Sequence, residues 1–265
     1  MIVTDSLRMG SRVRLGGGSE MPVLGFGTWK LAGGTCARAV REAVEAGYRL
    51  IDTASMYNNE EDVGEGIRQS GIDPEELFVT TKLWSNEHGY ENAMRACHRS
   101  LGKLGLDRVD LYLIHWPGGR NLDTWKAMIR LMEDEAVGAI GVSNFSLEQV
   151  DELTAGTGVT PEVDQVEFNP ENSDDALLAG CRSRGIVLEA YSPLRGTDLR
   201  DAAISEIARR HSRTAAQTVL RWVLQKGAVP IVKTSHRDRM LENAELFDFS
   251  LTPEEMGAID KVGRF

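Results

Sequence analysis

Residues 109–115 of the chain read Val-Asp-Leu-Tyr-Leu-Ile-His, and this stretch decides the fold. It is a short apolar run that ends in a side chain able to move protons. An apolar run of this length is typical of a strand buried in a parallel sheet. Two earlier runs have the same form, since residues 49–51 precede Asp52 and residues 77–81 precede Lys82. Catalytic groups of a parallel α/β barrel collect at the carboxyl ends of its strands, so the three runs predict such a barrel.

Strand-like and helix-like segments alternate along the rest of the chain. Residues 12–21 predict an N-terminal β-hairpin around a glycine-rich turn. Beyond it we expect eight strands, at residues 23–26, 49–52, 77–82, 109–115, 137–142, 162–167, 185–191 and 229–232. We expect helices at residues 35–46, 60–69, 90–104, 122–134, 146–153, 174–183, 201–211, 214–226, 237–244 and 253–262. The pattern favours an α/β fold, a closed (β/α)8 TIM barrel formed by residues 1–265 as one domain, over a six-stranded doubly wound sheet.

Composition and charge narrow the class of protein. The chain has 265 residues, of which 42% are hydrophobic and 26% charged, an ordinary composition for a soluble domain. The net charge of −10 argues against a nucleic-acid partner, which requires a basic surface. No run approaches the ~20 apolar residues of a membrane span, and we see no secretion signal. We therefore expect a cytoplasmic monomer without a membrane partner, in which Cys36, Cys97 and Cys181 are free thiols.

Four side chains near strand ends suggest proton-transfer chemistry: Asp52, Tyr57, Lys82 and His115. A free tyrosine titrates near 10, and a neighbouring ammonium such as that of Lys82 lowers the pKa and makes the phenol a better proton donor. Asp52 could pair with that ammonium in a dry barrel mouth, and His115 could hydrogen-bond a substrate carbonyl. Each residue taken alone is more often structural, but four at one end of successive strands favour a catalytic site.

A catalytic metal is not expected. His115 is the one histidine at a strand end, and the other four, His88, His98, His211 and His236, lie in loop-like or helix-like stretches. The strand ends offer no His-x-His pair and no close triplet of histidine and carboxylate ligands.

Eight motifs, in order along nearly the whole chain, resemble those of the aldo-keto reductases. They lie at residues 25–29, 52–60, 81–84, 113–117, 141–145, 165–170, 190–194 and 233–243. The short loops resemble those of the compact bacterial members. The resemblance implies a (β/α)8 barrel that reduces carbonyl compounds with a nicotinamide cofactor and no metal. It implies Tyr57 as the proton donor, with Asp52, Lys82 and His115 completing a catalytic tetrad.

The same resemblance implies where the nicotinamide would bind. Ser143, Asn144 and Gln165 correspond to the side chains that hold the carboxamide, and Tyr191 to the ring that stacks on the nicotinamide. Further implied cofactor contacts are Gly27, Thr28, Trp29 and Asp52 near the ring, and Ser192 and Leu194 along the pyrophosphate. The chain has no Gly-x-Gly-x-x-Gly after a strand, so a Rossmann site is not expected.

The phosphate end of the cofactor is implied at residues 233–243. Lys233, Thr234 and Arg239 resemble the group that binds the 2′-phosphate, and Glu242 and Asn243 would face the adenine. Two cations and a hydroxyl at the start of a helix suit a dianion, so NADPH or NADP+ is the expected cofactor and NADH a weaker one. The family usually has Ser where Thr234 stands, and this change keeps the hydroxyl.

Aromatic side chains outline the expected substrate pocket. Trp29, Trp84 and Trp116 would form its walls, with Tyr57 and His115 at its floor. The expected partner is a small-molecule carbonyl compound, reduced in a reaction of the alcohol dehydrogenase (NADP+) type. Because a fold alone does not settle function, two alternatives stay open. One is a cofactor-binding regulatory or sensor subunit with little turnover, and the other is an unrelated barrel hydrolase.

Overall fold

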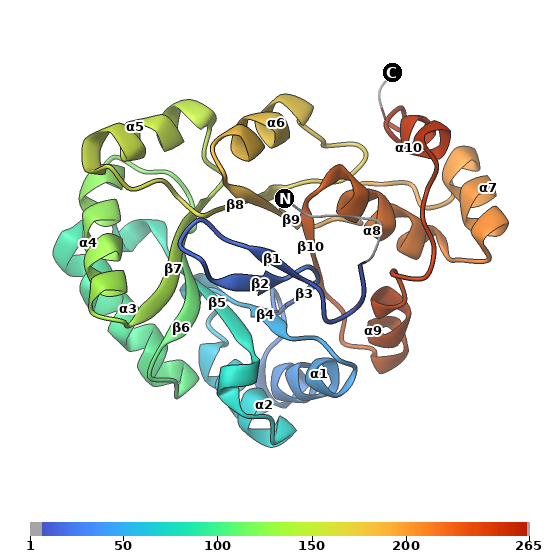
Figure 1. The fold of residues 1–265 in the computed structure, drawn as a ribbon. Helices are drawn as coiled ribbons and strands as arrows, with labels where there is room; N and C mark the ends of the chain where they lie inside the picture. The colour runs from blue at the N-terminus through green and yellow to red at the C-terminus, as the bar shows by residue number, and fades with distance from the viewer. Residues whose placement is uncertain (1–6, 264–265) are drawn as a thin grey trace.

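The computed structural model describes residues 7–263 and places them in a closed barrel of parallel strands (Figure 1). The strand order is β10-β3-β4-β5-β6-β7-β8-β9, and β10 pairs with β3 to close the barrel. The strands are β3 (Gly25–Gly27), β4 (Leu50–Asp52), β5 (Phe78–Leu83), β6 (Val109–Ile114), β7 (Val137–Ser143), β8 (Val163–Glu167), β9 (Val187–Tyr191) and β10 (Val229–Val232). The predicted (β/α)8 TIM barrel is therefore confirmed.

Helices surround the barrel on its outer side (Figure 1). They are α1 (Gly33–Glu45), α2 (Glu60–Ser70), α3 (Tyr90–Leu104), α4 (Asn121–Glu133), α5 (Leu147–Thr157), α6 (Asp175–Ser183), α7 (Ala202–His211), α8 (Ala215–Lys226), α9 (Arg237–Ala244) and α10 (Pro253–Ile259). Short 3-10 helices, η2 (Ser55–Tyr57), η3 (Pro74–Glu76) and η4 (Ser85–Glu87), follow or precede strands and were not predicted.

Local sequence signals explain many helix ends. Helices α5, α8 and α10 begin at capping boxes formed by Ser146, Thr214 and Thr252. Helix α5 was expected to stop at residue 153, where its apolar pattern fades, but it continues to a left-handed glycine, Gly158. The glycine stop decides the length because it can adopt the positive φ that ends a helix.

An N-terminal hairpin, β1 (Arg12–Arg14) paired antiparallel with β2 (Glu20–Pro22), lies across one end of the barrel (Figure 1). The backbone N–H of Gly17 in its turn donates a hydrogen bond of 2.6 Å to Oε2 of Glu162. Because Glu162 immediately precedes β8, the hairpin covers the amino ends of the strands. The carboxyl ends are left for the candidate site.

The barrel interior is packed with side chains. A Cβ atom at Gly25 of β3 would collide with methyl groups of Ile231 and Leu50, so a side chain there would have to displace both. The three cysteines are buried free thiols. Within residues 7–263, no helix is long and apolar enough to cross a membrane.

Candidate active site

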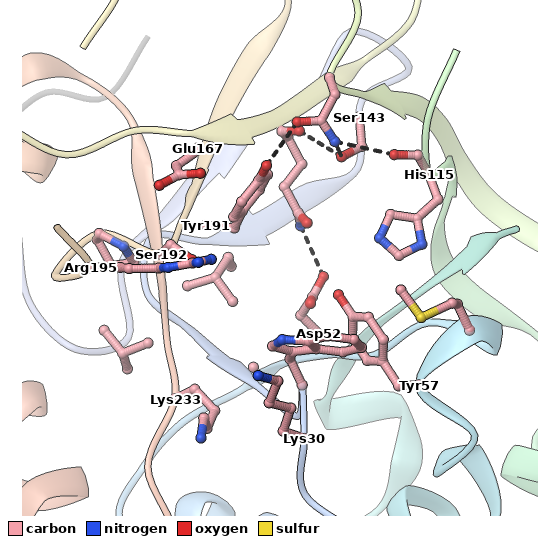
Figure 2. A pocket seen from close by; sticks show the side chains of 18 of the residues that line it. Lys30, Asp52, Tyr57, His115, Ser143, Glu167, Tyr191, Ser192, Arg195 and Lys233 are labelled. Carbon is pink, nitrogen blue, oxygen red and sulfur yellow. Dashed lines mark hydrogen bonds between the residues drawn. The ribbon is translucent and has the colours of Figure 1, made fainter. Parts of the chain in front are cut away.

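A cavity of about 670 Å³ opens at the carboxyl ends of the strands (Figure 2). Side chains that follow or end several strands line it, including Asp52, Tyr57, His115, Gln165 and Tyr191. This is the end at which the sequence placed the catalytic groups.

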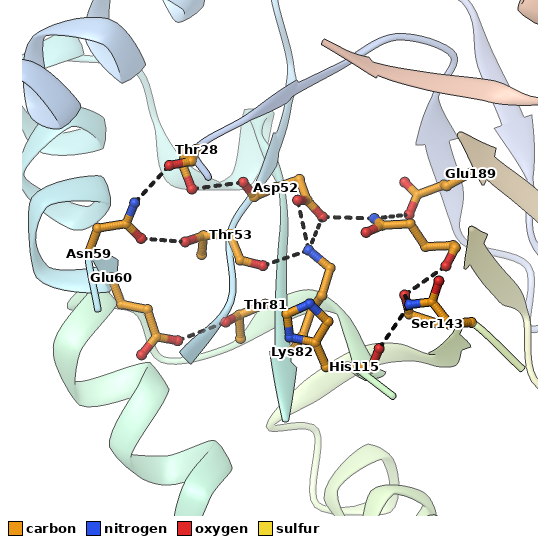
Figure 3. A network of polar contacts seen from close by, with 12 residues as sticks. Thr28, Asp52, Thr53, Asn59, Glu60, Thr81, Lys82, His115, Ser143 and Glu189 are labelled. Atoms are coloured by element: carbon orange, nitrogen blue, oxygen red, sulfur yellow. Dashed lines mark hydrogen bonds and ion pairs between the residues drawn. The ribbon is translucent and has the colours of Figure 1, made fainter. Parts of the chain in front are cut away.

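An ion pair joins the buried Lys82 to Asp52 at the floor of the cavity, and Figure 3 shows its contacts. Nζ of Lys82 is 2.7 Å and 2.6 Å from the two carboxylate oxygens of Asp52 and 2.9 Å from the carbonyl oxygen of Thr53. Lys82 is 0% exposed and Asp52 only 3%. Burial disfavours the charge of Lys82 and lowers its pKa, but Asp52, Tyr57 and Glu189 together outweigh that effect, so the net shift of the lysine pKa is upward. Lys82 is therefore a fixed buried cation.

Tyr57 is held over this ion pair by the short helix η2. The Ser55 hydroxyl donates to the backbone carbonyl of Lys82 at 2.9 Å, and Asn58 ends η2 in a left-handed conformation with φ of 55°. Nζ of Lys82 lies 5.2 Å from the centroid of the Tyr57 ring. The rings of Trp29 and His115 pack on Tyr57 with centroids 4.8 Å and 5.7 Å away.

The pKa of Tyr57 is shifted upward, whereas a downward shift was expected from the sequence. Burial raises it above its ordinary value, and this effect is larger than the lowering by the Lys82 ammonium. Lys82 thus acts with the expected sign, but the net shift is upward because the phenol is desolvated and Asp52 also opposes ionisation.

His115 is neutral in this environment. Burial and the nearby Lys82 ammonium lower its pKa to about 3. The ring of Trp84 packs edge-on against it at a centroid distance of 5.3 Å. Trp84 lines a separate cavity of about 350 Å³, whereas Trp29 and Trp116 line the main one. The expected role of Trp84 in the substrate pocket stays a prediction.

A chain of hydrogen bonds joins the four residues expected at the nicotinamide. The Ser143 hydroxyl donates to the backbone carbonyl of Gln165 at 2.7 Å, and Nδ2 of Asn144 donates to Ser143 Oγ at 2.9 Å. The Tyr191 hydroxyl donates to Oδ1 of Asn144 at 3.0 Å. Asn144 itself has φ of 63°, a left-handed conformation that asparagine tolerates. All four residues line the cavity.

The sequence reasoning missed Glu189, which lies inside the barrel on β9 and is 0% exposed. Nε2 of Gln165 is 2.9 Å from Oε2 of Glu189 and 2.9 Å from Oδ2 of Asp52 (Figure 3). The spacing of Glu189 from Tyr191 is a signal that could have found it. Side chains two residues apart on a strand point to the same side, so Glu189 and Tyr191 share one face of β9.

The residues expected at the phosphate end divide into two groups. Lys233, Ser192 and Leu194 line the cavity. Thr234 is buried, and its Oγ1 accepts a hydrogen bond from the backbone N–H of His236 at 3.1 Å. Arg239 is exposed on α9.

Three other predicted contacts are engaged within the fold. Glu242 accepts a hydrogen bond of 2.7 Å from the hydroxyl of Thr214 at the start of α8, and Asn243 is buried. The buried Thr28 donates from its hydroxyl to the backbone carbonyl of Asp52 at 3.0 Å, so it supports β4, while its neighbour Gly27 lines the cavity.

Four exposed cations are expected or available for phosphate binding, and we call Lys30, Arg195, Lys233 and Arg239 the basic rim. The first three line the cavity, and Figure 2 shows them on the side away from His115. Lys30 and Arg195 were not predicted, because a lone cation in a loop carries no sequence signal. Among residues 7–263, no group of three or more histidine, cysteine or carboxylate side chains is arranged to hold a metal ion.

Comparison with known proteins agrees with this geometry. The sequence pattern of the Aldo/keto reductase family matches residues 23–264. A glyoxal reductase of Bacillus subtilis is 45% identical over 95% of this chain and 92% of its own length. An aldo/keto reductase of Brucella melitensis superposes with a TM-score of 0.94, at 41% identity over 96% of this chain and 98% of its own. A Bombyx mori aldo-keto reductase solved in complex with NADP has a TM-score of 0.91 at 35% identity. The superposition covers 96% of this chain and 93% of the Bombyx mori chain. The chain therefore belongs to the aldo/keto reductase family of oxidoreductases.

Proposed function

We propose that this protein reduces aldehydes and ketones to alcohols with NADPH, and that Tyr57 is the proton donor. The observation that carries the proposal is the stacking of groups at the cavity floor. The Tyr57 ring lies 5.2 Å from Nζ of Lys82, which is itself paired with Asp52, and the neutral His115 lies beside the ring. A proton donor, a fixed cation and a neutral hydrogen-bonding ring are what carbonyl reduction requires of the protein.

The cavity fits a nicotinamide dinucleotide at both ends. Ser143, Asn144 and Gln165 offer amide and hydroxyl groups for a carboxamide, and the Tyr191 hydroxyl is tied to Asn144, which orients its ring. The basic rim suits the phosphates. When bound, NADPH supplies the hydride.

The side chains of the tetrad have separate tasks in this proposal. Tyr57 donates its proton to the carbonyl oxygen, and the Lys82 ammonium stabilises the phenolate that develops. Asp52 holds Lys82 in place, because a lone ammonium inside the barrel would be costly. His115 donates a hydrogen bond that orients the carbonyl, and its low pKa keeps it neutral throughout.

The substrate we propose is a reactive aldehyde, including dicarbonyls of the glyoxal type. The name of the Bacillus subtilis relative supports this class, and so does the open aromatic mouth, since Trp29 is 41% and Trp116 42% exposed. A monomeric state, a single domain and a cytoplasmic location stay predictions. The three buried free cysteines support a reducing compartment.

Steady-state oxidation of NADPH in the presence of glyoxal tests the proposal. We expect saturable turnover that depends on both reactants and consumes them one for one. Tight binding of NADPH without turnover of any aldehyde or ketone in a panel would favour the sensor subunit. Absence of NADPH binding would favour an unrelated barrel enzyme such as a hydrolase.

A further inference from the structure

The proposed mechanism leaves one buried acid without a task, Glu189. It lies inside the barrel, 0% exposed, and its Oε1 is buried without a hydrogen-bond partner among the described residues. A buried carboxyl with an unmet hydrogen bond is costly to the fold, so its position calls for an explanation.

Glu189 acts on the cavity through the amide of Gln165. A primary amide has two N–H donors on its nitrogen. Nε2 of Gln165 lies 2.9 Å from an oxygen of Asp52 and 2.9 Å from an oxygen of Glu189 (Figure 3). Both donors are therefore committed below the floor, and the group that Gln165 presents to the cavity is its acceptor oxygen, Oε1.

The two acids together determine which way the amide faces. Rotating the Gln165 amide by half a turn would place Oε1 against the Asp52 carboxylate, which has no hydrogen to donate, so that hydrogen bond would be lost. Asp52 alone engages one N–H and leaves the amide plane free to turn about that bond. Glu189 adds the second contact and fixes the plane.

A neutral acceptor is enough for this task. Burial and the negative charge of Asp52 raise the pKa of Glu189 to about 8. Lys82, which faces the same interior from β5, lowers it but is outweighed. At neutral pH the acid is mostly protonated, and Oε2 accepts from Gln165 as a carbonyl oxygen would. A glutamine in its place would keep that acceptor.

We propose that Glu189 is a positioning residue for cofactor recognition: it locks the Gln165 amide so that Oε1 accepts an N–H of the nicotinamide carboxamide. The inference rests on the proposed function, in which Gln165 contacts that carboxamide. It predicts that selectivity for a carboxamide over a group of the same size without N–H depends on a residue that does not itself line the cavity.

The test compares NADPH with its reduced 3-acetylpyridine analogue, which keeps the carbonyl oxygen but has no N–H. Dissociation constants are measured by fluorescence titration for the wild type, Glu189→Gln, Glu189→Met and Thr80→Val. Thr80 is a matched control, because it is 0% exposed, its hydroxyl has no described partner, and it lies two residues before Lys82 on β5. Replacing it alters a buried polar group without touching Gln165.

We expect the wild type to prefer NADPH over the analogue on the order of 10-fold, the value of about one hydrogen bond. Glu189→Met should reduce the preference to about 2-fold or less, mainly by weakening NADPH. Glu189→Gln and Thr80→Val should retain it. Thermal melts show that each variant is folded, and Glu189→Ala replaces Glu189→Met if the methionine is not accommodated.

Three results would overturn the inference. An unchanged preference in Glu189→Met would show that Asp52 alone orients the amide. Loss of the preference in Glu189→Gln would show that a charge, not a neutral acceptor, is needed. Loss in Thr80→Val would show that any change inside the barrel disturbs the site. Two further results concern the wild type. Equal affinity for NADPH and the analogue would contradict the contact between Gln165 and the carboxamide, and with it the inference. Absence of binding of both would contradict the proposed function itself.

Discussion

The barrel interior and the basic rim both carry charge, but they hold it in opposite ways. Below the floor, Lys82 is 0% exposed and has three oxygen atoms within 2.9 Å. On the rim, Lys233 and Arg239 are exposed, and within residues 7–263 none of the four rim cations forms an ion pair. Elsewhere on the surface most arginines pair with a carboxylate, for example Arg130 with Asp134 at 2.6 Å. The rim stands out in a chain of net charge −10.

The difference indicates that the interior charges are oriented before a ligand binds, whereas the rim charges gain their partners only when a ligand binds. Interior groups are already oriented, so their field acts on a reacting atom without reorganisation. Rim groups are exposed cations without a carboxylate partner among the described residues, so they are available to pair with a phosphate. Changes to the interior should therefore affect turnover and stability, and changes to the rim should affect cofactor affinity.

The largest effect is expected from Tyr57→Phe, which removes the proposed proton donor and leaves the ring packed between Trp29 and His115. We expect kcat to fall by about 10²–10⁴-fold, with the NADPH dissociation constant unchanged. Stopped-flow and steady-state kinetics measure the first quantity and fluorescence titration the second. Turnover within a few-fold of wild type would exclude Tyr57 as the donor.

Lys82→Met should act on both turnover and stability. It leaves Asp52 buried without its cation, and breaking a buried ion pair commonly costs about 3–5 kcal/mol of unfolding free energy. Urea denaturation measures this loss. The matched control is Arg130→Ala, which breaks an exposed pair and should change stability little. Equal stability of the two variants would mean that the buried ion pair contributes no more to the free energy of unfolding than the exposed pair does.

The pH dependence of stability should report on His115. Its pKa is about 3 when folded and near 6.5 when unfolded, so between those values the unfolded chain binds more protons. The stabilisation is present above pH ~6.5 and is lost as the pH falls, by on the order of 3 kcal/mol at pH 4. Subtracting the curve of His115→Gln isolates this contribution from the carboxyl groups. If the stability of the wild type and that of His115→Gln change with pH in parallel, the imidazole is not desolvated in the folded protein.

The smallest effect is expected on the rim. Lys233→Met or Arg239→Ala should weaken NADPH about 10-fold to 100-fold and NADH little, because only NADPH carries the 2′-phosphate. Arg237→Ala is the matched control, since Arg237 lies on the same helix but pairs with Glu45 at 3.9 Å. If both cofactors weaken alike, or if the control weakens NADPH equally, the phosphate binds elsewhere.

Local patterns in the sequence were sufficient for the barrel and for placing Asp52, Lys82 and His115 at one end of it. Apolar runs such as residues 109–114 are typical of strands buried in a parallel sheet, and the capping boxes and glycine stops mark helix ends. A polar residue directly after such a run must lie at the carboxyl end of a strand. Asp52, Lys82 and His115 could therefore be placed together before any coordinates.

Contacts across the barrel were decided by the tertiary structure alone. Gln165 and Glu189 are 24 residues apart and meet only because the register of β8 and β9 brings them side by side. The edge-on contact of the Trp84 and His115 rings depends on packing that no local pattern contains. The upward shift of the Tyr57 pKa depends on how much water the closed cavity floor excludes. Sequence determines which groups face the barrel, whereas distances and solvent exclusion arise only when distant segments pack together.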